Sequence, residues 1–246
     1  MLGAQVLLGV AMIALWEWAG RTYGSTWTSL PSKIGGRLVE WAGSTLARNI
    51  GVTLAEIGIG LAIGATLGVI AGLLLGRTRV ASVVLRPIIV GLYSIPVVTL
   101  APLIILWFGL EMTPKIVLVS ISAFFLLFFN TFAGVTGIDP DVTSSLRLMG
   151  ATPSEEFRKL AAPGAMPWIV SGLKIAVPYA IAAAVTGELL AAREGMGSLI
   201  SAAAAQFDMT GLYAALVVLM IIGIIASVAM NGVEARLLRW RQGMEP

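Results

Sequence analysis

The organisation of the chain depends on one stretch, Asp139-Pro-Asp-Val-Thr-Ser-Ser-Leu-Arg-Leu-Met-Gly-Ala-Thr-Pro-Ser-Glu-Glu-Phe-Arg-Lys-Leu-Ala-Ala-Pro-Gly-Ala-Met-Pro-Trp168. Apolar runs surround it, yet seven charged residues fall between positions 139 and 159. Charged side chains are costly in hydrocarbon and rare within membrane helices. We therefore expect a water-facing helical segment between two membrane-embedded halves, at a place where a soluble partner can bind.

The composition is that of a membrane protein. Of the 246 residues, 58% are hydrophobic and 12% are charged, whereas about a quarter of a soluble domain is charged. Cysteine and histidine are both missing from the sequence, which excludes disulfides, thiolate metal sites and imidazole catalysis. We predict an all-α polytopic membrane protein with no metal ligands and no catalytic residues. The net charge of +3 does not indicate nucleic-acid binding, because in membrane proteins it is the distribution of Lys and Arg that matters.

Six stretches are apolar and long enough to cross a bilayer, which takes about 20 residues with a range of roughly 17 to 25. No small-residue cleavage site follows the first, so we expect a retained helix and not a signal peptide. The polar connection at residues 21–49 is either an interfacial helix or a packed loop. The predicted spans are about Gln5–Gly20, Ile50–Leu75, Leu85–Leu110, Lys115–Gly137, Trp168–Leu190 and Leu212–Ala235.

Glycines recur every four residues along the second span. This spacing places them on one helix face, where a neighbouring helix can approach closely. Two roles fit: packing inside the same bundle, which is the commoner use of such a face, and homodimerisation. The glycines are Gly60, Gly64, Gly68, Gly72 and Gly76.

Two prolines interrupt the third span, and they break or bend its helix. Helices with freed carbonyls are tolerated where they line a cavity, which makes this span a candidate wall of a pathway; a purely structural kink is the alternative. Farther along, Glu188 lies near the outer mouth or anchors the turn Arg193–Gly197. The candidate translocation path comprises Ser94, Pro96, Thr99, Asn130, Thr186 and Glu188.

Lys and Arg residues favour the side that holds residues 139–168. If the N-terminus is inside, the inner side carries Arg77, Arg79, Arg86, Arg147, Arg158, Lys159, Arg236, Arg239 and Arg241. The outer side then carries Arg21, Lys33, Arg37, Arg48, Lys115 and Arg193. Because cytoplasmic loops are enriched in these residues, we predict that both termini and the charged stretch are cytoplasmic.

Local signals divide the charged stretch into two short helices. Pro140 can start the first, at about Asp141–Met149, and Gly150 ends it as a residue that adopts a left-handed conformation. Thr152-Pro-Ser-Glu155 is a capping-box pattern for the second, at about Pro153–Ala161. Pro163 is expected to end that helix. An apolar patch between the charges would comprise Leu148, Phe157 and Leu160. On spacing alone the segment is either a docking helix with an exposed aromatic ring or a loop helix that lies on the membrane.

The spacing of Gly150 and Leu160-Ala-Ala-Pro163 resembles a known loop signature. Binding-protein-dependent ATP-binding-cassette (ABC) importer permeases carry Glu-Ala-Ala, three residues, Gly, nine residues, Ile, one residue and Leu-Pro. Here Ser144-Ser-Leu146 replaces Glu-Ala-Ala, Leu160 replaces Ile, and Ala162 precedes the proline.

The resemblance covers nearly the whole chain from Pro31 onward, and it is to the nitrate, sulfonate, taurine and bicarbonate branch. The matching segments are Ser94-Ile-Pro96, Ala101-Pro-Leu103, Leu106-Trp-Phe-Gly109, Pro163-Gly-Ala-Met-Pro167, Gly172-Leu-Lys-Ile175, Glu188-Leu-Leu-Ala-Ala-Arg-Glu-Gly-Met-Gly197 and Arg239-Trp-Arg241.

This resemblance implies a type I importer permease with six transmembrane helices in a bacterial inner membrane. Two copies would form a homodimer above two ATPase subunits, and a periplasmic or lipid-anchored binding protein would deliver the solute. No cofactor is expected in this chain: ATP and Mg would bind the ATPases, since the chain has no Gly-x-x-x-x-Gly-Lys-Ser/Thr motif. Coupling to the ATPase would involve Gly150, Ala151, Thr152, Pro153, Glu156, Phe157, Leu160 and Pro163.

The same resemblance implies how the chain divides and what it carries. Residues 1–49 would form the first helix and a periplasmic connection, residues 50–236 the core with its coupling loop at 139–168, and residues 237–246 a cytoplasmic tail. The solute would be a small organic or inorganic anion, such as a sulfonate, taurine, nitrate or an aromatic acid, or alternatively a vitamin precursor. An ion-coupled secondary transporter is the alternative class of protein, because Glu56 and Glu188 are intramembrane carboxylates. Such carriers are typically built from repeated halves, and the sequence shows no internal repeat.

Overall fold

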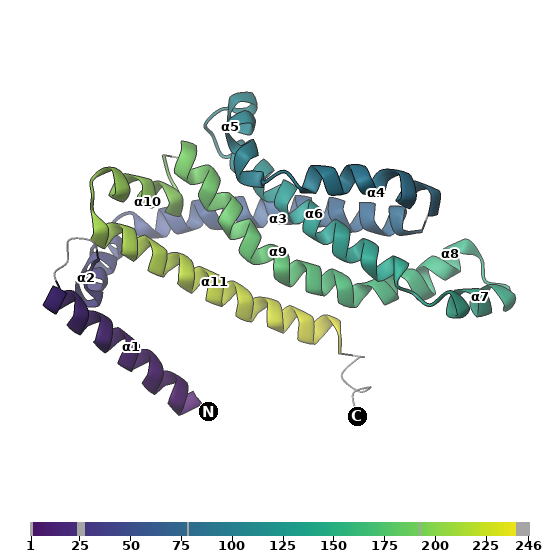
Figure 1. Ribbon diagram of the computed structural model, residues 1–246, viewed down its shortest axis with the longest axis horizontal. Coiled ribbons are helices and arrows are strands. Elements are labelled where there is room, and N and C mark those ends of the chain that lie inside the picture. Colours follow the sequence, from purple (N-terminus) through teal and green to yellow (C-terminus); the bar gives the residue numbers. More distant parts are fainter. Residues whose placement is uncertain (1, 24–27, 78, 192, 240–246) are drawn as a thin grey trace.

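A computed structural model describes residues 2–23, 28–77, 79–191 and 193–239, without the side chains of 2–6, 23, 79–83, 85 and 86. The described residues form helices joined by short connections, in an elongated bundle (Figure 1). The α7–α8 connection lies at one end of the bundle, and α2 and α10 lie at the other. The predicted all-α fold is confirmed. In chain order, the helices are α1 (Leu2–Tyr23), α2 (Pro31–Ala42), α3 (Leu46–Gly76), α4 (Arg79–Tyr93), α5 (Val97–Phe108), α6 (Thr113–Thr136), α7 (Pro140–Leu148), α8 (Pro153–Glu156), α9 (Ala162–Ala191), α10 (Met196–Ala205) and α11 (Met209–Leu237).

Within the described residues, four helical segments are long and apolar enough to cross a membrane. They are Leu46–Gly76, Thr113–Thr136, Pro153–Ala191 and Met209–Leu237. A fifth span results if the bent pair α4–α5 is counted as one. These five correspond to the last five predicted spans. The first predicted span lies within α1, whose first side chains are outside the described residues, and its crossing stays a prediction.

The glycine face of α3 packs against α6, inside the same bundle, and the α3–α6 interface is the most extensive between helices of the described residues. A Cβ atom at Gly60 would lie 2.6 Å from Cβ of Val119, and one at Gly72 would lie 2.7 Å from Cβ of Thr131. Only a residue without a side chain allows this approach. The hydroxyl of Ser120 adds a 3.1 Å hydrogen bond to the carbonyl of Gly60. The two helices therefore form a tightly joined unit.

The third predicted span is two helices and not one. α4 and α5 meet at an angle of 83°, and the break falls between Tyr93 and Val97, at Ser94-Ile95-Pro96. Pro96 precedes the first residue of α5 and cannot donate a backbone hydrogen bond to the preceding helix, which explains the break. Pro102 lies inside α5 without ending it. The short helix α5 projects from the bundle in Figure 1.

The expected second helix of the charged stretch is not a separate helix. From Pro153 the chain continues through α8, a π-helical turn at Phe157–Ala161 and α9, with no break until Ala191. The prediction that Pro163 ends this helix is wrong. A proline clashes with the carbonyl four residues earlier in a regular α-helix, but here that carbonyl belongs to the wider π turn, in which Ala162 donates to Phe157 five residues back. The wider turn relieves the clash and lets the helix continue.

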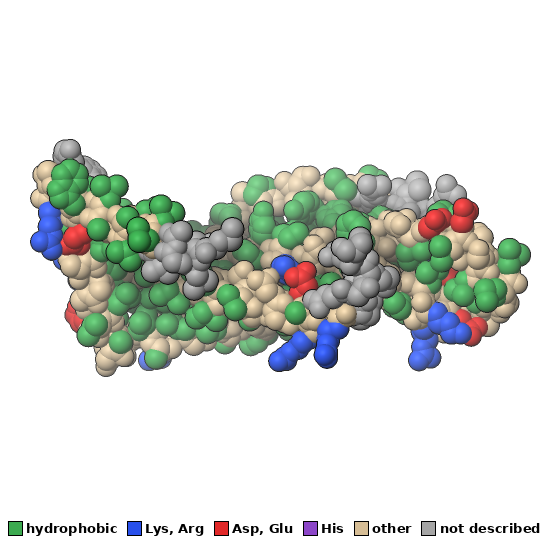
Figure 2. Space-filling view, turned by 90° about the horizontal axis from the view of Figure 1, so that it is seen from below, with side chains coloured by type: hydrophobic (Ala, Val, Ile, Leu, Met, Phe, Trp, Pro, Cys, Tyr) green, Lys and Arg blue, Asp and Glu red, His purple; other side chains and the backbone are tan. Residues whose placement is uncertain are grey.

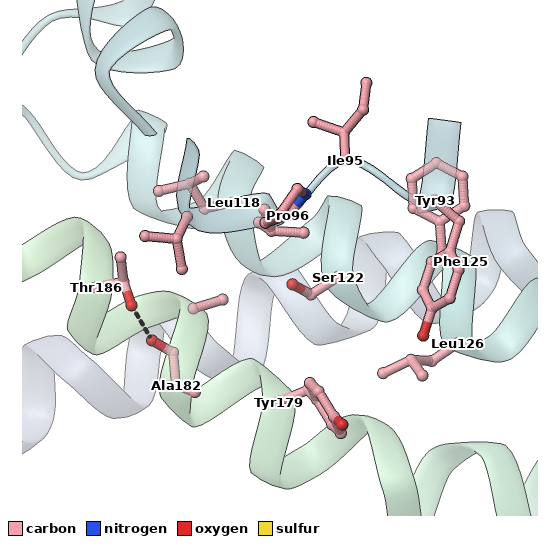
Figure 3. A pocket seen from close by; sticks show the side chains of 13 residues that line it. Tyr93, Ile95, Pro96, Leu118, Ser122, Phe125, Leu126, Tyr179, Ala182 and Thr186 are labelled. Atoms are coloured by element: carbon pink, nitrogen blue, oxygen red, sulfur yellow. Dashed lines mark hydrogen bonds between the residues drawn. The ribbon is translucent and has the colours of Figure 1, made fainter. Parts of the chain in front are cut away.

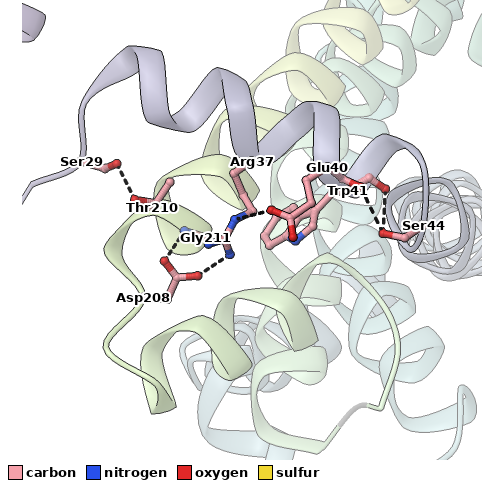
Figure 4. A network of polar contacts seen from close by, with 8 residues as sticks. All are labelled: Ser29, Arg37, Glu40, Trp41, Ser44, Asp208, Thr210 and Gly211. Atoms are coloured by element: carbon pink, nitrogen blue, oxygen red, sulfur yellow. Dashed lines mark hydrogen bonds and ion pairs between the residues drawn. The ribbon is translucent and has the colours of Figure 1, made fainter.

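At the opposite end, α2 packs against α11. The polar connection is thus a packed helix: Ile34 is buried, and Leu38 and Trp41 contact the buried side chains of α11. Arg37 pairs with Asp208, whose carboxylate also accepts a 3.0 Å hydrogen bond from the backbone N–H of Gly211 (Figure 4). Partial burial alone would raise the pKa of Asp208, but these two donors outweigh it and lower that pKa below its ordinary value. This network fixes the start of α11 against α2.

Two predicted features lie partly outside the residues that the structure describes. The short basic connection after α3 includes Arg79 and Arg86, whose side chains are not among those described, and residues 240–246 of the predicted tail lie outside the described residues.

Candidate functional site: a cavity and the segment that leads to it

Local caps build the α7–α8 connection as the sequence predicts. The carboxylate of Asp139 accepts a 2.8 Å hydrogen bond from the N–H of Asp141, which caps α7. Gly150 has a φ of +84°, a left-handed conformation that favours glycine. Thr152 and Glu155 form the reciprocal capping box. The connection is therefore a rigid turn between two helices and not a flexible linker.

Ion pairs tie the two arms of the turn together. The guanidinium of Arg147 donates two hydrogen bonds to the carboxylate of Glu156, at 2.8 and 3.0 Å. A planar guanidinium is suited to such a two-point contact. These bonds favour the charged form and raise the pKa of Arg147 above its ordinary value. Lys159 pairs with Glu155 one turn away on the second arm.

The exposed apolar tip is at Leu148 and Met149, which are 89% and 84% exposed. Phe157, by contrast, is half-buried beneath the guanidinium of Arg77, whose central carbon lies 4.8 Å from the ring centroid. The expectation that Phe157 is the exposed aromatic ring is thus wrong, because Arg77 covers it. Leu160 is also half-buried. In Figure 2, charged side chains gather at this end of the molecule beside apolar ones.

The residues predicted to couple to the ATPase surround this turn. Gly150, Thr152 and Pro153 are exposed, as is Pro163, the second residue of α9. The remaining four predicted residues are half-buried, and three of them line a small polar cavity of about 340 Å³ between the turn and the ends of α3 and α6. These three are Ala151, Glu156 and Leu160. Their contact with an ATPase stays a prediction.

A second cavity, of about 350 Å³, lies between the α4–α5 bend, α6 and α9 (Figure 3). Its walls are mostly apolar, and none of the described residues that line it is charged. Three aromatic residues line it, together with one serine and one threonine; these are Tyr93, Phe125, Tyr179, Ser122 and Thr186. Such a site suits a small, partly apolar solute with a few polar groups.

Of the predicted path residues, only Pro96 and Thr186 line this cavity. Ser94 lies in the bend, and its hydroxyl donates to the carbonyl of Val90 in α4. Thr99 lies in α5, and its hydroxyl donates to the carbonyl of Pro96. Asn130 lies against Gly172, at the α6–α9 interface. The structure therefore brings two of the six together at the cavity, and the role of all six in transport stays a prediction.

Glu188, 1% exposed, lies away from the cavity in a buried polar cluster. Its carboxylate accepts a 2.6 Å hydrogen bond from the hydroxyl of Thr53 and a 2.7 Å bond from the N–H of Gly197. Thr53 in turn accepts a 2.9 Å bond from the N–H of Met196. The prediction that Glu188 anchors the turn before α10 is thus confirmed. Glu56, also 1% exposed, lies in the same buried region.

The sequence alone does not single out four of the lining residues, Tyr93, Ser122, Phe125 and Tyr179. One signal could have found Tyr179, which directly follows the intrahelical Pro178. Tyr93 likewise lies three positions before Pro96. The position of Ser122 carries no such local signal, because it depends on how α6 faces α9.

A family profile described as "Binding-protein-dependent transport system inner membrane component" matches residues 64–239. The chain belongs to this family. It is an ABC importer permease subunit, the membrane component of a transport system.

Relatives in this family match along almost the full chain. The formylaminopyrimidine transport permease protein ThiX of Halalkalibacterium halodurans is 33% identical over 238 residues, covering 96% of this chain and 95% of the relative. The putative aliphatic sulfonates transport permease protein SsuC of Bacillus subtilis is 28% identical, covering 98% and 88%. The taurine transport system permease protein TauC of Escherichia coli is 26% identical, covering 80% and 72%. These names confirm the branch that the motifs resemble.

A solved structure confirms the type I importer fold of this permease. A chain from the inward-facing MetNI methionine ABC transporter superposes with a TM-score of 0.69 at 22% identity, covering 78% of this permease and 95% of that chain.

Proposed function

We propose that this permease forms one half of the channel of an ATP-driven importer and that a partner ATPase grips its α7–α8 turn. One observation carries the proposal: the helix that starts at Pro153 in the turn continues without a break to Ala191. It passes the cavity on the way, with Tyr179 and Thr186 on the cavity wall. A movement of the turn can therefore be transmitted to the cavity through one continuous helix, Pro153–Ala191.

The exposed tip is chemically suited to a protein groove. Leu148 and Met149 stand free between the paired charges of Arg147 and Glu156. An apolar tip with a polar rim is the usual composition of a protein–protein contact. Two ATPase subunits, which bind ATP and Mg, would each receive one such turn from two copies of the permease. ATPase closure would then switch the path between its inward-facing and outward-facing states.

We place the α7–α8 end in the cytoplasm of a bacterial cell and the α2–α10 end outside, with both chain ends cytoplasmic. The distribution of Lys and Arg supports this orientation. A periplasmic or lipid-anchored binding protein would deliver the solute at the α2–α10 end. Residues 1–49, 50–236 and 237–246 would then be the first helix with its outer connection, the core and the cytoplasmic tail.

For the solute, the cavity favours a small polar heteroaromatic compound of the vitamin-precursor type over an anion. Aromatic rings and hydroxyls line it, and no Lys or Arg occurs among its described lining residues. The relative at 33% identity is named for formylaminopyrimidine transport, which agrees with this chemistry. Sulfonates remain the second candidate, because the SsuC relative covers a similar share of the chain.

Co-purification tests the machinery, and ligand binding tests the solute. We expect the permease, expressed with the ATPase and binding protein encoded beside it, to purify as a complex that hydrolyses ATP. The binding protein should bind a formylaminopyrimidine more tightly than taurine in calorimetry. A permease that transports as a single chain without ATP would refute the machinery, and a binding protein that prefers taurine would refute only the choice of solute.

A further inference from the structure

Arg77 links the end of α3 to the start of the helix that runs into α9. It directly follows the last residue of α3. Its Nη2 donates a 3.0 Å hydrogen bond to the carbonyl of Pro153, and its guanidinium covers the ring of Phe157. Both partners lie on the segment Pro153–Ala161, which leads into α9. A single side chain thus holds the start of that helix at two points.

The two parts that Arg77 joins carry opposite walls of the cavity. α3 is locked to α6 by the glycine face, and α6 supplies Ser122 and Phe125 to the cavity. α9 supplies Tyr179 and Thr186 from the other side. Motion of the coupling segment reaches the α9 wall directly, through the helix. The α6 wall is linked to the same turn because α6 leads into α7 and packs along α9, and Arg77 adds a direct link from the segment to α3, the other helix of the α3–α6 unit.

The continuous helix Pro153–Ala191 also has positions where it can bend, between the coupling turn and the cavity. The π-helical turn at Phe157–Ala161 and the prolines at 163 and 167 fall between the coupling turn and the cavity wall. π turns and prolines are the usual places where helices bend. The contacts of Arg77 with Pro153 and Phe157 lie just before the π turn and at its first residue. They therefore fix how the segment is oriented when a force arrives.

We propose that Arg77 is a positioning residue that holds the coupling segment to the end of α3, so that the α3–α6 unit moves together with that segment when ATP acts on it. This inference rests on the proposed function, because it assumes that an ATPase acts on the α7–α8 turn. The guanidinium is suited to the task, since it donates a directed hydrogen bond and stacks on an aromatic face at the same time. A lysine in its place keeps the charge but not the planar face.

The chain offers a clean spectroscopic test because it has no cysteine. Leu126→Cys on α6 and Ala182→Cys on α9 place two spin labels across the cavity, whose lining includes both positions. The distance between the labels is measured in the assembled complex, without nucleotide and with Mg-ATP and vanadate. The same pair is built into wild type, Arg77→Gln, Arg77→Lys and the control Arg158→Gln. Arg158 is an exposed cation of the same segment, so its substitution matches the loss of charge.

We expect Arg77→Gln to retain bound ATPase but to lose at least half of the nucleotide-driven distance change. Arg77→Lys should be intermediate, and Arg158→Gln should match wild type. An equal distance change in Arg77→Gln and Arg158→Gln would overturn the inference, as would loss of the ATPase from Arg77→Gln, which would make Arg77 an assembly residue. If Arg77→Gln does not fold, Phe157→Leu, which removes only the ring, must show the reduced change. Absence of any nucleotide-driven change in wild type would instead refute the proposed function.

Discussion

The glycine face of α3 makes a prediction whose size follows from the structure. A Cβ atom at Gly64 would overlap the carbonyl oxygen of Ser120 and lie 2.9 Å from Cβ of Ala123. At Gly58, six residues earlier on the same helix, an added Cβ would meet nothing within 4 Å. The substitutions Gly64→Ala and Gly58→Ala therefore differ in packing alone.

The magnitude comes from that difference. Alanine is favoured over glycine in a helix by roughly 0.8–1.0 kcal/mol, and this gain applies to both variants. Overpacking costs about 1–3 kcal/mol and applies to Gly64→Ala only. The variants should thus differ in stability by about 1–3 kcal/mol. For a chain of this size each kcal/mol shifts Tm by about 2–4 °C, so Gly64→Ala should unfold roughly 2–12 °C below Gly58→Ala.

Thermal unfolding in one detergent, followed by fluorescence of the seven tryptophans, measures this difference. Both variants must be heated at the same rate, because unfolding of membrane proteins is often irreversible and Tm then depends on scan rate. Equal Tm values for the two variants would refute the close packing of α3 on α6.

Three further predictions follow from the caps and the buried cluster. The pKa of Asp208 is lowered in the folded state, so its stabilising effect is present above its unfolded pKa of about 3.9 and is lost as pH falls through the folded value. Over this pH range Tm should drop less for Asp208→Asn than for wild type. Plots of Tm against pH that run parallel for the two proteins would contradict this. Gly150→Ala should cost about 1–2 kcal/mol, because alanine resists the left-handed conformation, and should lower transport per ATP; an unchanged ratio would show that the turn does not set the position of the tip. Glu188→Ala leaves the hydroxyl of Thr53 and the N–H of Gly197 unpaired, so it should destabilise the folded permease by about 1–3 kcal/mol per group. Glu188→Gln should destabilise it less. Equal Tm values for the two variants would count against the hydrogen bonds.

The local features of the charged stretch could be predicted from the sequence because neighbouring residues determine them. The cap at Asp139, the left-handed Gly150 and the capping box at Thr152 each depend on a few residues of one turn. The glycine face was also predictable as a packing surface, since its four-residue period identifies one side of a helix.

Features set by distant residues could not be predicted. Phe157 is covered because Arg77, far earlier in the chain, ends α3 beside it. The helix continues past Pro163 because a π turn precedes it, and no simple sequence pattern predicts a π turn. The cavity depends on how α6 and α9 face each other. The sequence therefore does not identify Ser122 as a lining residue, and Asn130, a more polar residue, lies at the α6–α9 interface instead.

The central claim is that this permease moves its solute only when a separate ATPase acts on the α7–α8 turn. The most direct test places the purified permease in liposomes with its binding protein, with or without the ATPase and internal ATP. Uptake of labelled formylaminopyrimidine and labelled taurine is followed in parallel. We predict uptake of one of them only when both the ATPase and ATP are present. Uptake by the permease without ATP would contradict the claim.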